Sequence, residues 1–264
     1  MRLLFVIVVQ VLLLCVPIWG EEEVPPQLRD IKITEHLNER IDLKVSFTDE
    51  TGRVVELGEY FNQGRAVVMN LVYYGCPALC GLVLNGVTKA LKQVPGVPGK
   101  DYEVVTISID HRETPRLAAA KKAAVIETLG KAGAEVGWHF LVGSEQNIRR
   151  VADQVGFGFK WVEQSQQFAH GAVTILLTAD GRISRYLYGI EYEPRDFRLA
   201  LTEAGEGKYG SAVDKLLLFC FHYDATVGSY VFFAKNIMRA GGILTVVILG
   251  IGLGRFWLKE RQVV

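Results

Sequence analysis

The chain has 264 residues, enough for one sizeable domain with additional segments or for two small domains. Lysine and arginine together number 29, as do aspartate and glutamate, so no net charge favours a nucleic acid or a strongly acidic partner. No basic run with interleaved aromatic residues and no phosphate-binding glycine loop of the usual spacing occurs, which argues against nucleic-acid binding and nucleotide hydrolysis. Hydrophobic residues make up 50% of the chain, and their excess lies at the two ends.

Residues 1–20 have the order of a secretory signal peptide. One basic residue, Arg2, precedes an apolar stretch that is broken by Pro17, and three glutamates follow. An uncleaved N-terminal anchor is the alternative, because the last three residues of the segment make a poor small-x-small cleavage site. We therefore expect export from the cytoplasm, with residues 21–35 as a linker.

A strand, a cysteine pair and a helix follow one another in the first half of the chain. Residues Asp42–Thr48 alternate apolar and polar, which predicts a half-buried strand. Residues Ala66–Tyr74 form a continuous apolar run of strand length, suited to the centre of a sheet. Cys76 and Cys80 come directly after it, and apolar residues then recur at helical spacing from Leu79 to Val94, just before Pro95.

The second half repeats this alternation of strands and helices. We expect strands at Tyr102–Ile109 and Trp138–Val142, each followed by a helix. The first of these helices begins at Thr114 with proline at its first position, and the second is capped by Ser144. Two final strands complete the pattern around a hairpin turn at Thr178–Gly181: Val173–Leu177 and Ile183–Tyr188. The order β, α, β, α, β, β predicts an α/β domain with a thioredoxin-like fold over residues 36–205.

The C-terminal part of the chain predicts a membrane anchor. Residues 240–258 are apolar and glycine-rich, and they just reach the roughly 20 residues that cross a bilayer. A buried core helix is the alternative. We expect residues 206–239 to be a juxtamembrane segment and residues 259–264 a basic cytoplasmic tail. Together with export, this places the main domain on the extracytoplasmic, periplasmic side of a membrane.

The cysteine pair is the first candidate site. Cys76 and Cys80 are four residues apart at the start of a helix, so both sulfurs lie on one face. The free N–H groups of a helix N-terminus stabilise thiolate, which is the form that binds metal and attacks disulfides. A structural disulfide, thiol–disulfide redox chemistry and metal binding are all open readings, although a disulfide closing so short a loop stabilises little. The usual redox motif has two residues between its cysteines rather than three, and the wider spacing suits two ligands on one soft metal ion.

A third ligand has to come from elsewhere in the chain, and His170 is the candidate. It lies in a predicted loop just before the Val173–Leu177 strand, and in this fold that loop lies beside the cysteine-bearing helix. Two thiolates and one imidazole suit copper, because soft sulfur selects Cu(I). Zinc accepts the same ligands but favours a fourth. We also expect Tyr73 and Tyr74 to shield the site.

Three motifs in this order resemble the SCO/SenC family of copper chaperones for cytochrome c oxidase. They are the Tyr73–Cys80 segment, the Ile107–Pro115 segment with its Ser-x-Asp and Thr-Pro pairs, and His170 ahead of the Asp180-Gly181 turn. The resemblance extends from about Leu43 to Gly189, with family-like distances between the motifs. The C-terminal anchor is similar to that of bacterial SCO-like proteins, whereas many members carry an N-terminal anchor.

The resemblance implies a site and a partner. The copper ligands would be Cys76, Cys80 and His170, and the protein would load the binuclear copper centre of cytochrome c oxidase subunit II. A separate copper donor protein would be a second partner. Asp110 would stand behind the ligands and orient His170 or a cysteine, unless it merely caps the following helix. The chain departs from the family after Asp110, where a second acidic residue is common and His111-Arg112-Glu113 stands here.

The leading hypothesis is therefore a copper metallochaperone, a binding protein rather than an enzyme. The alternative is a thiol–disulfide oxidoreductase that keeps the cysteines of the oxidase copper site reduced; it would use Cys76 and Cys80 as its redox pair and would not need His170. A copper or redox sensor is a third reading. Cys220 and His222 are two residues apart, which suggests a second metal site, but an apolar segment at the membrane surface is the reading we favour.

Overall fold

The computed structural model describes residues 31–61, 63–76 and 79–209, the strands at 221–224 and 229–232, and a few positions between 242 and 252. Leu79, Cys80 and the two late strands are described through their backbone alone. The predicted signal peptide and nearly all of the predicted membrane helix lie outside these residues. Among the described residues, no helix combines the length and the apolar character needed to cross a membrane.

A five-stranded mixed sheet forms the centre of the domain, in the order β5-β4-β3-β8-β9. The β3, β4 and β5 strands are parallel, β8 pairs antiparallel with β3, and β9 pairs antiparallel with β8. All five were predicted, with small differences at their ends: β3 Val67–Val72, β4 Glu103–Ser108, β5 Trp138–Leu141, β8 Val173–Leu177 and β9 Ile183–Tyr188. Every residue of β3, β4 and β8 is buried, which fits their largely apolar sequences.

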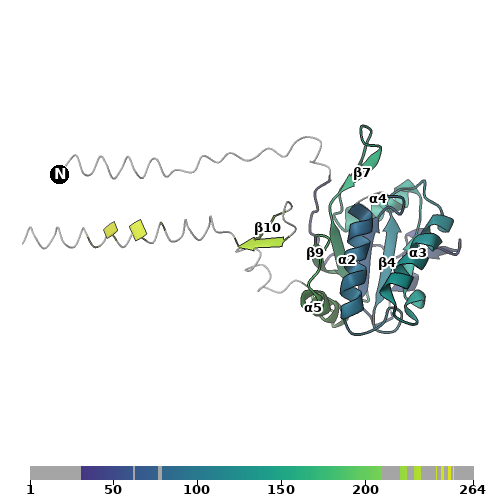
Figure 1. The fold of residues 1–264 in the computed structure, drawn as a ribbon, viewed down its shortest axis with the longest axis horizontal. Helices are drawn as coiled ribbons and strands as arrows, with labels where there is room; N and C mark the ends of the chain where they lie inside the picture. Colours follow the sequence, from purple (N-terminus) through teal and green to yellow (C-terminus); the bar gives the residue numbers. More distant parts are fainter. Residues whose placement is uncertain are drawn as a thin grey trace, which may run out of the picture.

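Helices connect the parallel strands and cover the sheet. The α2 helix, Leu79–Gln93, links β3 to β4, and α3, Pro115–Leu129, links β4 to β5; Figure 1 shows the two side by side over one face. The Thr114 side chain accepts a hydrogen bond from the first turn of α3, and Ser144 does the same for α4, Glu145–Gln154. Both predicted caps are confirmed.

The strand register decides which residues meet at one edge of the sheet. Val72, the last residue of β3, lies opposite Ser108, the last residue of β4, so the loops that follow these strands are neighbours. The antiparallel pairing of Asn70 with Thr174 brings the start of β8 to the same edge. The segments carrying Cys76, Asp110 and His170 therefore emerge together, as the predicted thioredoxin-like arrangement requires.

Three parts of the domain differ from the sequence prediction. His170 was expected in a loop, but it is the last residue of strand β7, Gln167–His170, which pairs with β6, Phe159–Val162, in a hairpin that projects beyond the sheet (Figure 1). A last helix, α5, Pro194–Gly205, packs against β9 and was not predicted. The predicted Asp42–Thr48 strand is shorter, because only β1, Ser46–Thr48, pairs with β2, Val54–Glu56.

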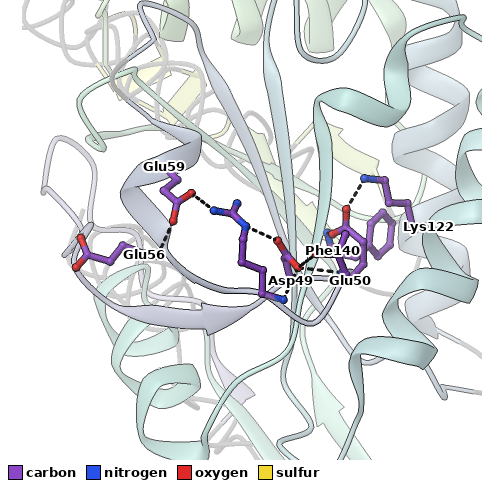
Figure 2. Close-up of polar contacts among 8 residues, drawn as sticks. Asp49, Glu50, Glu56, Glu59, Lys122 and Phe140 are labelled. Atoms are coloured by element: carbon purple, nitrogen blue, oxygen red, sulfur yellow. Dashed lines mark hydrogen bonds and ion pairs between the residues drawn. The ribbon is translucent and has the colours of Figure 1, made fainter.

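The loop between β1 and β2 is anchored to the sheet by a network of charges (Figure 2). Glu50 contacts the Lys122 ammonium with one carboxylate oxygen and accepts the backbone N–H of Phe140 at 3.0 Å with the other. Beside it, Asp49 and Glu59 bind Arg53. Since β5 is the outermost strand of the five-stranded sheet, Glu50 supplies an acceptor for a backbone donor on its outer side, next to the bridge between Thr48 and Val142.

Candidate metal centre

The first cysteine lies in a tight turn between strand β3 and helix α2. The Cys76 backbone N–H donates to the Tyr73 carbonyl at 3.3 Å, and Cys76 is partly buried against the core. Helix α2 begins at Leu79, so the backbone of Cys80 stands in its first turn. Cys80 therefore stands in the first turn of the helix as predicted, whereas Cys76 lies in the turn before the helix, three residues ahead of Leu79. The free backbone N–H groups at a helix start favour thiolate.

The two tyrosines before the cysteines have different environments. Tyr74 points into the core, where its hydroxyl contacts the carbonyls of Thr106 at 3.0 Å and Leu141 at 2.8 Å. Burial, and then the nearby Glu113 carboxylate, raise the pKa of Tyr74 well above its ordinary value. The expected shielding role is therefore wrong for Tyr74, which instead holds the end of β3 to β4 and β5. Tyr73 faces the other way and meets His170 edge-on, with ring centroids 6.3 Å apart.

The imidazole of His170 is held in one orientation at the end of β7. Only 7% of the residue is exposed, and its Nδ1 lies 2.8 Å from the Gly171 carbonyl oxygen. A carbonyl oxygen can only accept, so Nδ1 carries the proton and Nε2 carries the lone pair. Burial lowers the pKa of His170 below its ordinary value, although the bond to Gly171 opposes the shift. The side chain is therefore neutral at neutral pH, the form that binds metals.

Aromatic side chains surround His170 and link it to the cysteine turn. Phe157 packs on the imidazole at 5.7 Å and Tyr73 contacts it from the opposite segment, while Phe168 of the same strand contacts Tyr73 at 5.6 Å. Since Tyr73 is three residues before Cys76 and bonds to its N–H, the imidazole stands beside the turn that carries the cysteine. The predicted approach of the late histidine to the cysteine segment is seen in this contact.

Asp110 does not cap the following helix, because Thr114 does. Its carboxylate binds Arg112, whose Nε and second guanidinium nitrogen donate at 2.7 Å each. Burial opposes ionisation of Asp110, but the hydrogen bonds from the Arg112 side chain and backbone outweigh it and keep the pKa of Asp110 below its ordinary value. The Arg112 guanidinium also lies 4.4 Å from the Trp161 ring in the hairpin that carries His170. A direct orienting contact from Asp110 to a ligand stays a prediction.

Glu113 is a residue of the site that sequence reasoning missed. Its carboxylate accepts the backbone N–H groups of Tyr74 at 2.8 Å and Gly75 at 2.6 Å, together with the hydroxyl of Ser108 at 2.6 Å. The loop after β4 is thereby joined to the turn that leads into Cys76. Only the Ser108 contact lies close enough in sequence to have been anticipated.

Two of the remaining histidines have structural surroundings, and His111 is exposed in the loop after β4. His36 bonds to the Gln154 carbonyl at 3.0 Å, and His139 contacts Glu103 and stacks on Tyr60. Within the described side chains, no group of three metal-binding residues is gathered, and the side chain of Cys80 lies outside that set. The side chains of Cys220 and His222 also lie outside it, so the predicted choice between a second metal site and an apolar segment stays open.

The family of the chain follows from a comparison with family models. The model described as SCO1/SenC matches residues 34–202, well over half of the sequence. The chain belongs to the SCO1/SenC family. The match includes both cysteines, the loop after β4 and His170, so the predicted recognition is confirmed.

Solved structures carry the same fold as this SCO1/SenC protein. A protein from Aquifex aeolicus VF5 is 23% identical, with a TM-score of 0.56 over 65% of this chain and 95% of its own. BsSco, a member of the Sco family of cytochrome c oxidase assembly proteins, is 19% identical with a TM-score of 0.51 over 66% and 98%. Arabidopsis thaliana ScoI, solved with copper bound, is 16% identical with a TM-score of 0.50 over 61% and 96%. The comparison with curated proteins finds no significant match.

Proposed function

We propose that this SCO1/SenC protein is a metallochaperone that carries copper on Cys76, Cys80 and His170. The observation that carries the proposal is the buried, neutral imidazole of His170, which is held with its proton on Nδ1 beside the turn of Cys76. An imidazole prepared in this way suits metal binding through Nε2. A histidine that binds a metal usually donates the N–H of its other ring nitrogen to a carbonyl or carboxylate oxygen, as Nδ1 of His170 does to Gly171.

The donor set supports copper as the cargo. Two thiolates and one imidazole form a soft site of low coordination number, which selects Cu(I) among the common metals. The structure of the related Arabidopsis ScoI is solved with copper bound, which agrees with this choice. The rings of Tyr73 and Phe157 contact the imidazole, Phe168 packs on Tyr73, and together they would limit the access of water to a bound ion.

The receiver of the copper would be the binuclear copper centre of cytochrome c oxidase subunit II, with a separate protein as copper donor. Support comes from the family, since the related BsSco belongs to the cytochrome c oxidase assembly proteins. A partly buried Cys76 in a turn at the edge of the domain is accessible to an incoming thiolate. Copper could then pass between proteins by stepwise exchange of sulfur ligands.

A thiol–disulfide oxidoreductase acting on the oxidase cysteines is the alternative. It needs Cys76, just before helix α2, and Cys80, in the first turn of that helix, where thiolate is favoured. It has no use for a buried imidazole with a fixed tautomer. The arrangement of His170 therefore favours the chaperone, and removing this side chain separates the two functions.

We expect His170→Ala to weaken Cu(I) binding by about 10–100-fold or more, since losing a ligand should cost at least as much as losing the group that supports one. The reduction potential of the Cys76–Cys80 pair should shift only slightly, because it depends on the thiols and their disulfide. Competition with a chromophoric Cu(I) chelator would measure the affinity, and titration with a thiol redox buffer would measure the potential.

The matched control is His111→Ala, which removes an exposed imidazole from the loop after β4 and should leave copper affinity at the wild-type value. In cells, His170→Ala should impair oxidase assembly as severely as loss of a cysteine does. Normal oxidase assembly with His170→Ala, combined with failure of Cys76→Ser, would establish the reductase function instead.

For the location we propose a domain outside the cytoplasm, held by a membrane helix at residues 240–258 and exported by the signal at residues 1–20. Its support is the apolar composition of both ends and the basic residues after the second. A reporter fused after Val264 should be active only as a cytoplasmic reporter, and one fused after Gly205 only as an exterior one. The same side for both fusions would refute the membrane helix.

A further inference from the structure

The carboxylate of Glu113 occupies two consecutive backbone donors immediately before Cys76. Oε1 accepts the N–H of Gly75 at 2.6 Å, and Oε2 accepts the N–H of Tyr74 at 2.8 Å. Successive N–H groups of a turn that point to one side form a small anion-binding concavity. In this protein the concavity is filled by a side chain that is 38 residues away from Gly75 in the sequence and fixed beside it by the register of β3 and β4.

A third hydrogen bond, from the end of β4, also fixes the carboxylate. The Ser108 hydroxyl donates to Oε2 of Glu113 at 2.6 Å and itself accepts the backbone N–H of Asp110 at 3.1 Å. The carboxylate thus accepts three hydrogen bonds, two from the cysteine turn and one from the end of β4. Hydrogen bonds to an ionised acceptor are roughly twice as strong as neutral ones, so this arrangement joins the two loops firmly.

The space around Gly75 agrees with this tight contact. A Cβ atom at position 75 would lie 3.2 Å from Oε1 of Glu113, closer than most such atoms approach a neighbour. The carboxylate lies directly against the backbone. By contrast, the turn's own bond from Cys76 N–H to the Tyr73 carbonyl is long, at 3.3 Å, and would hold the cysteine only weakly by itself.

We infer that Glu113 is a positioning residue for the copper site, whose carboxylate holds the Tyr74–Gly75 backbone so that Cys76 is presented as a ligand. The inference rests on the proposed copper function, and it adds to the three proposed ligands a residue that does not itself contact the metal. A turn fixed before the metal arrives does not have to be ordered on binding, and that ordering would otherwise weaken the affinity.

The test is Glu113→Gln in the full-length chain. Glutamine has nearly the same shape but only one acceptor oxygen. Its NH2 group would point at one of the two backbone N–H groups, where two donors cannot bond to each other. The amides of Tyr74 and Gly75 should exchange with solvent deuterium faster in the metal-free protein, while segments of the central sheet exchange at wild-type rates. Cu(I) affinity should fall by about 10–100-fold, the range typical of groups that support a metal ligand.

The matched control is Glu127→Gln, which removes the same charge from an exposed position of helix α3 and should change neither quantity. A second variant, Ser108→Ala, leaves both bonds from the cysteine turn in place and removes the third, together with the acceptor of the Asp110 backbone N–H. Ser108→Ala should lower the Cu(I) affinity less than Glu113→Gln does. If Glu113→Gln does not fold, the Cu(I) affinity of Ser108→Ala tests the positioning role instead.

The outcomes separate this inference from the proposed function. Wild-type protein that binds no Cu(I) would refute the copper function itself. Wild-type protein that binds Cu(I), with Glu113→Gln binding equally well or keeping wild-type exchange at Tyr74 and Gly75, would overturn the positioning role alone. If only Glu113→Gln fails to fold, an affinity of Ser108→Ala equal to that of the wild type would overturn it as well.

Discussion

Replacing either cysteine of the pair with serine should abolish tight Cu(I) binding. Serine keeps the size of cysteine but offers a hard hydroxyl oxygen that is protonated at neutral pH, whereas Cu(I) prefers thiolate sulfur. The full-length wild-type chain, reduced and loaded with Cu(I) without oxygen, should retain one copper ion per chain against a competing chelator. Under the same conditions Cys76→Ser and Cys80→Ser should retain almost none.

The control for this prediction is Cys220→Ser. That cysteine lies outside the matched family region, so the variant should keep one copper ion per chain and wild-type affinity if the three proposed ligands are complete. Two copper ions in the wild type and one in Cys220→Ser would instead point to a second metal site there. Full-affinity copper in Cys76→Ser or in Cys80→Ser would refute the proposed ligand set.

The central strands were predictable from the sequence because they are buried uniformly, and helices α3 and α4 because typical capping residues precede them. Strands β3, β4 and β8 are buried along their whole length, and the caps of α3 and α4 are the hydroxyl residues that such positions prefer. Since the fold places the ends of β3 and β4 and the start of β8 at one edge, the approach of His170 to the cysteine segment could also be anticipated.

Two missed elements left signals in the sequence. Helix α5 begins with proline at its first position and buries residues at helical spacing: Phe197, Ala200, Leu201 and Ala204. Strand β6 reads Phe-Lys-Trp-Val, a short alternating pattern, but its partner β7 is brief and its turn includes Gln166 with a φ of 53°. A hairpin of four-residue strands with a polar turn is weakly specified by local sequence, which is why His170 was placed in a loop.

The role of Glu113 could not have come from local sequence. Its bonds to Tyr74 and Gly75 exist because Val72 pairs with Ser108, and that register is a property of the assembled sheet. The same applies to Arg112, which reaches both Asp110 and the Trp161 ring. The Ser-x-Asp and Thr-Pro segment was recognised as a motif, and the structure supplies a physical reason for it: this loop contacts both the cysteine turn and the histidine hairpin.

The stability of the domain should depend strongly on Glu50. Its side chain is 12% exposed and that of its partner Lys122 is 16% exposed, so the pair is largely removed from water. Glu50→Ala leaves the Lys122 ammonium without its counter-ion and the Phe140 N–H without an acceptor (Figure 2). Removing one partner of a buried ion pair costs about 3–5 kcal/mol, so we expect the free energy of unfolding to fall by about that amount.

Three further variants make this expectation specific. Arg53→Ala removes a side chain that is 58% exposed from the same network and should cost less than about 1 kcal/mol. Glu50→Gln keeps an acceptor for the Phe140 N–H, so its loss of unfolding free energy should lie between those of Glu50→Ala and Arg53→Ala. The double variant Glu50→Ala with Lys122→Ala should lose less unfolding free energy than the sum of the two single variants. Urea unfolding midpoints at unchanged slope would measure all four. A midpoint of Glu50→Ala no lower than that of Arg53→Ala would show that the anchoring of the β1–β2 loop to the outer strand contributes little to the fold.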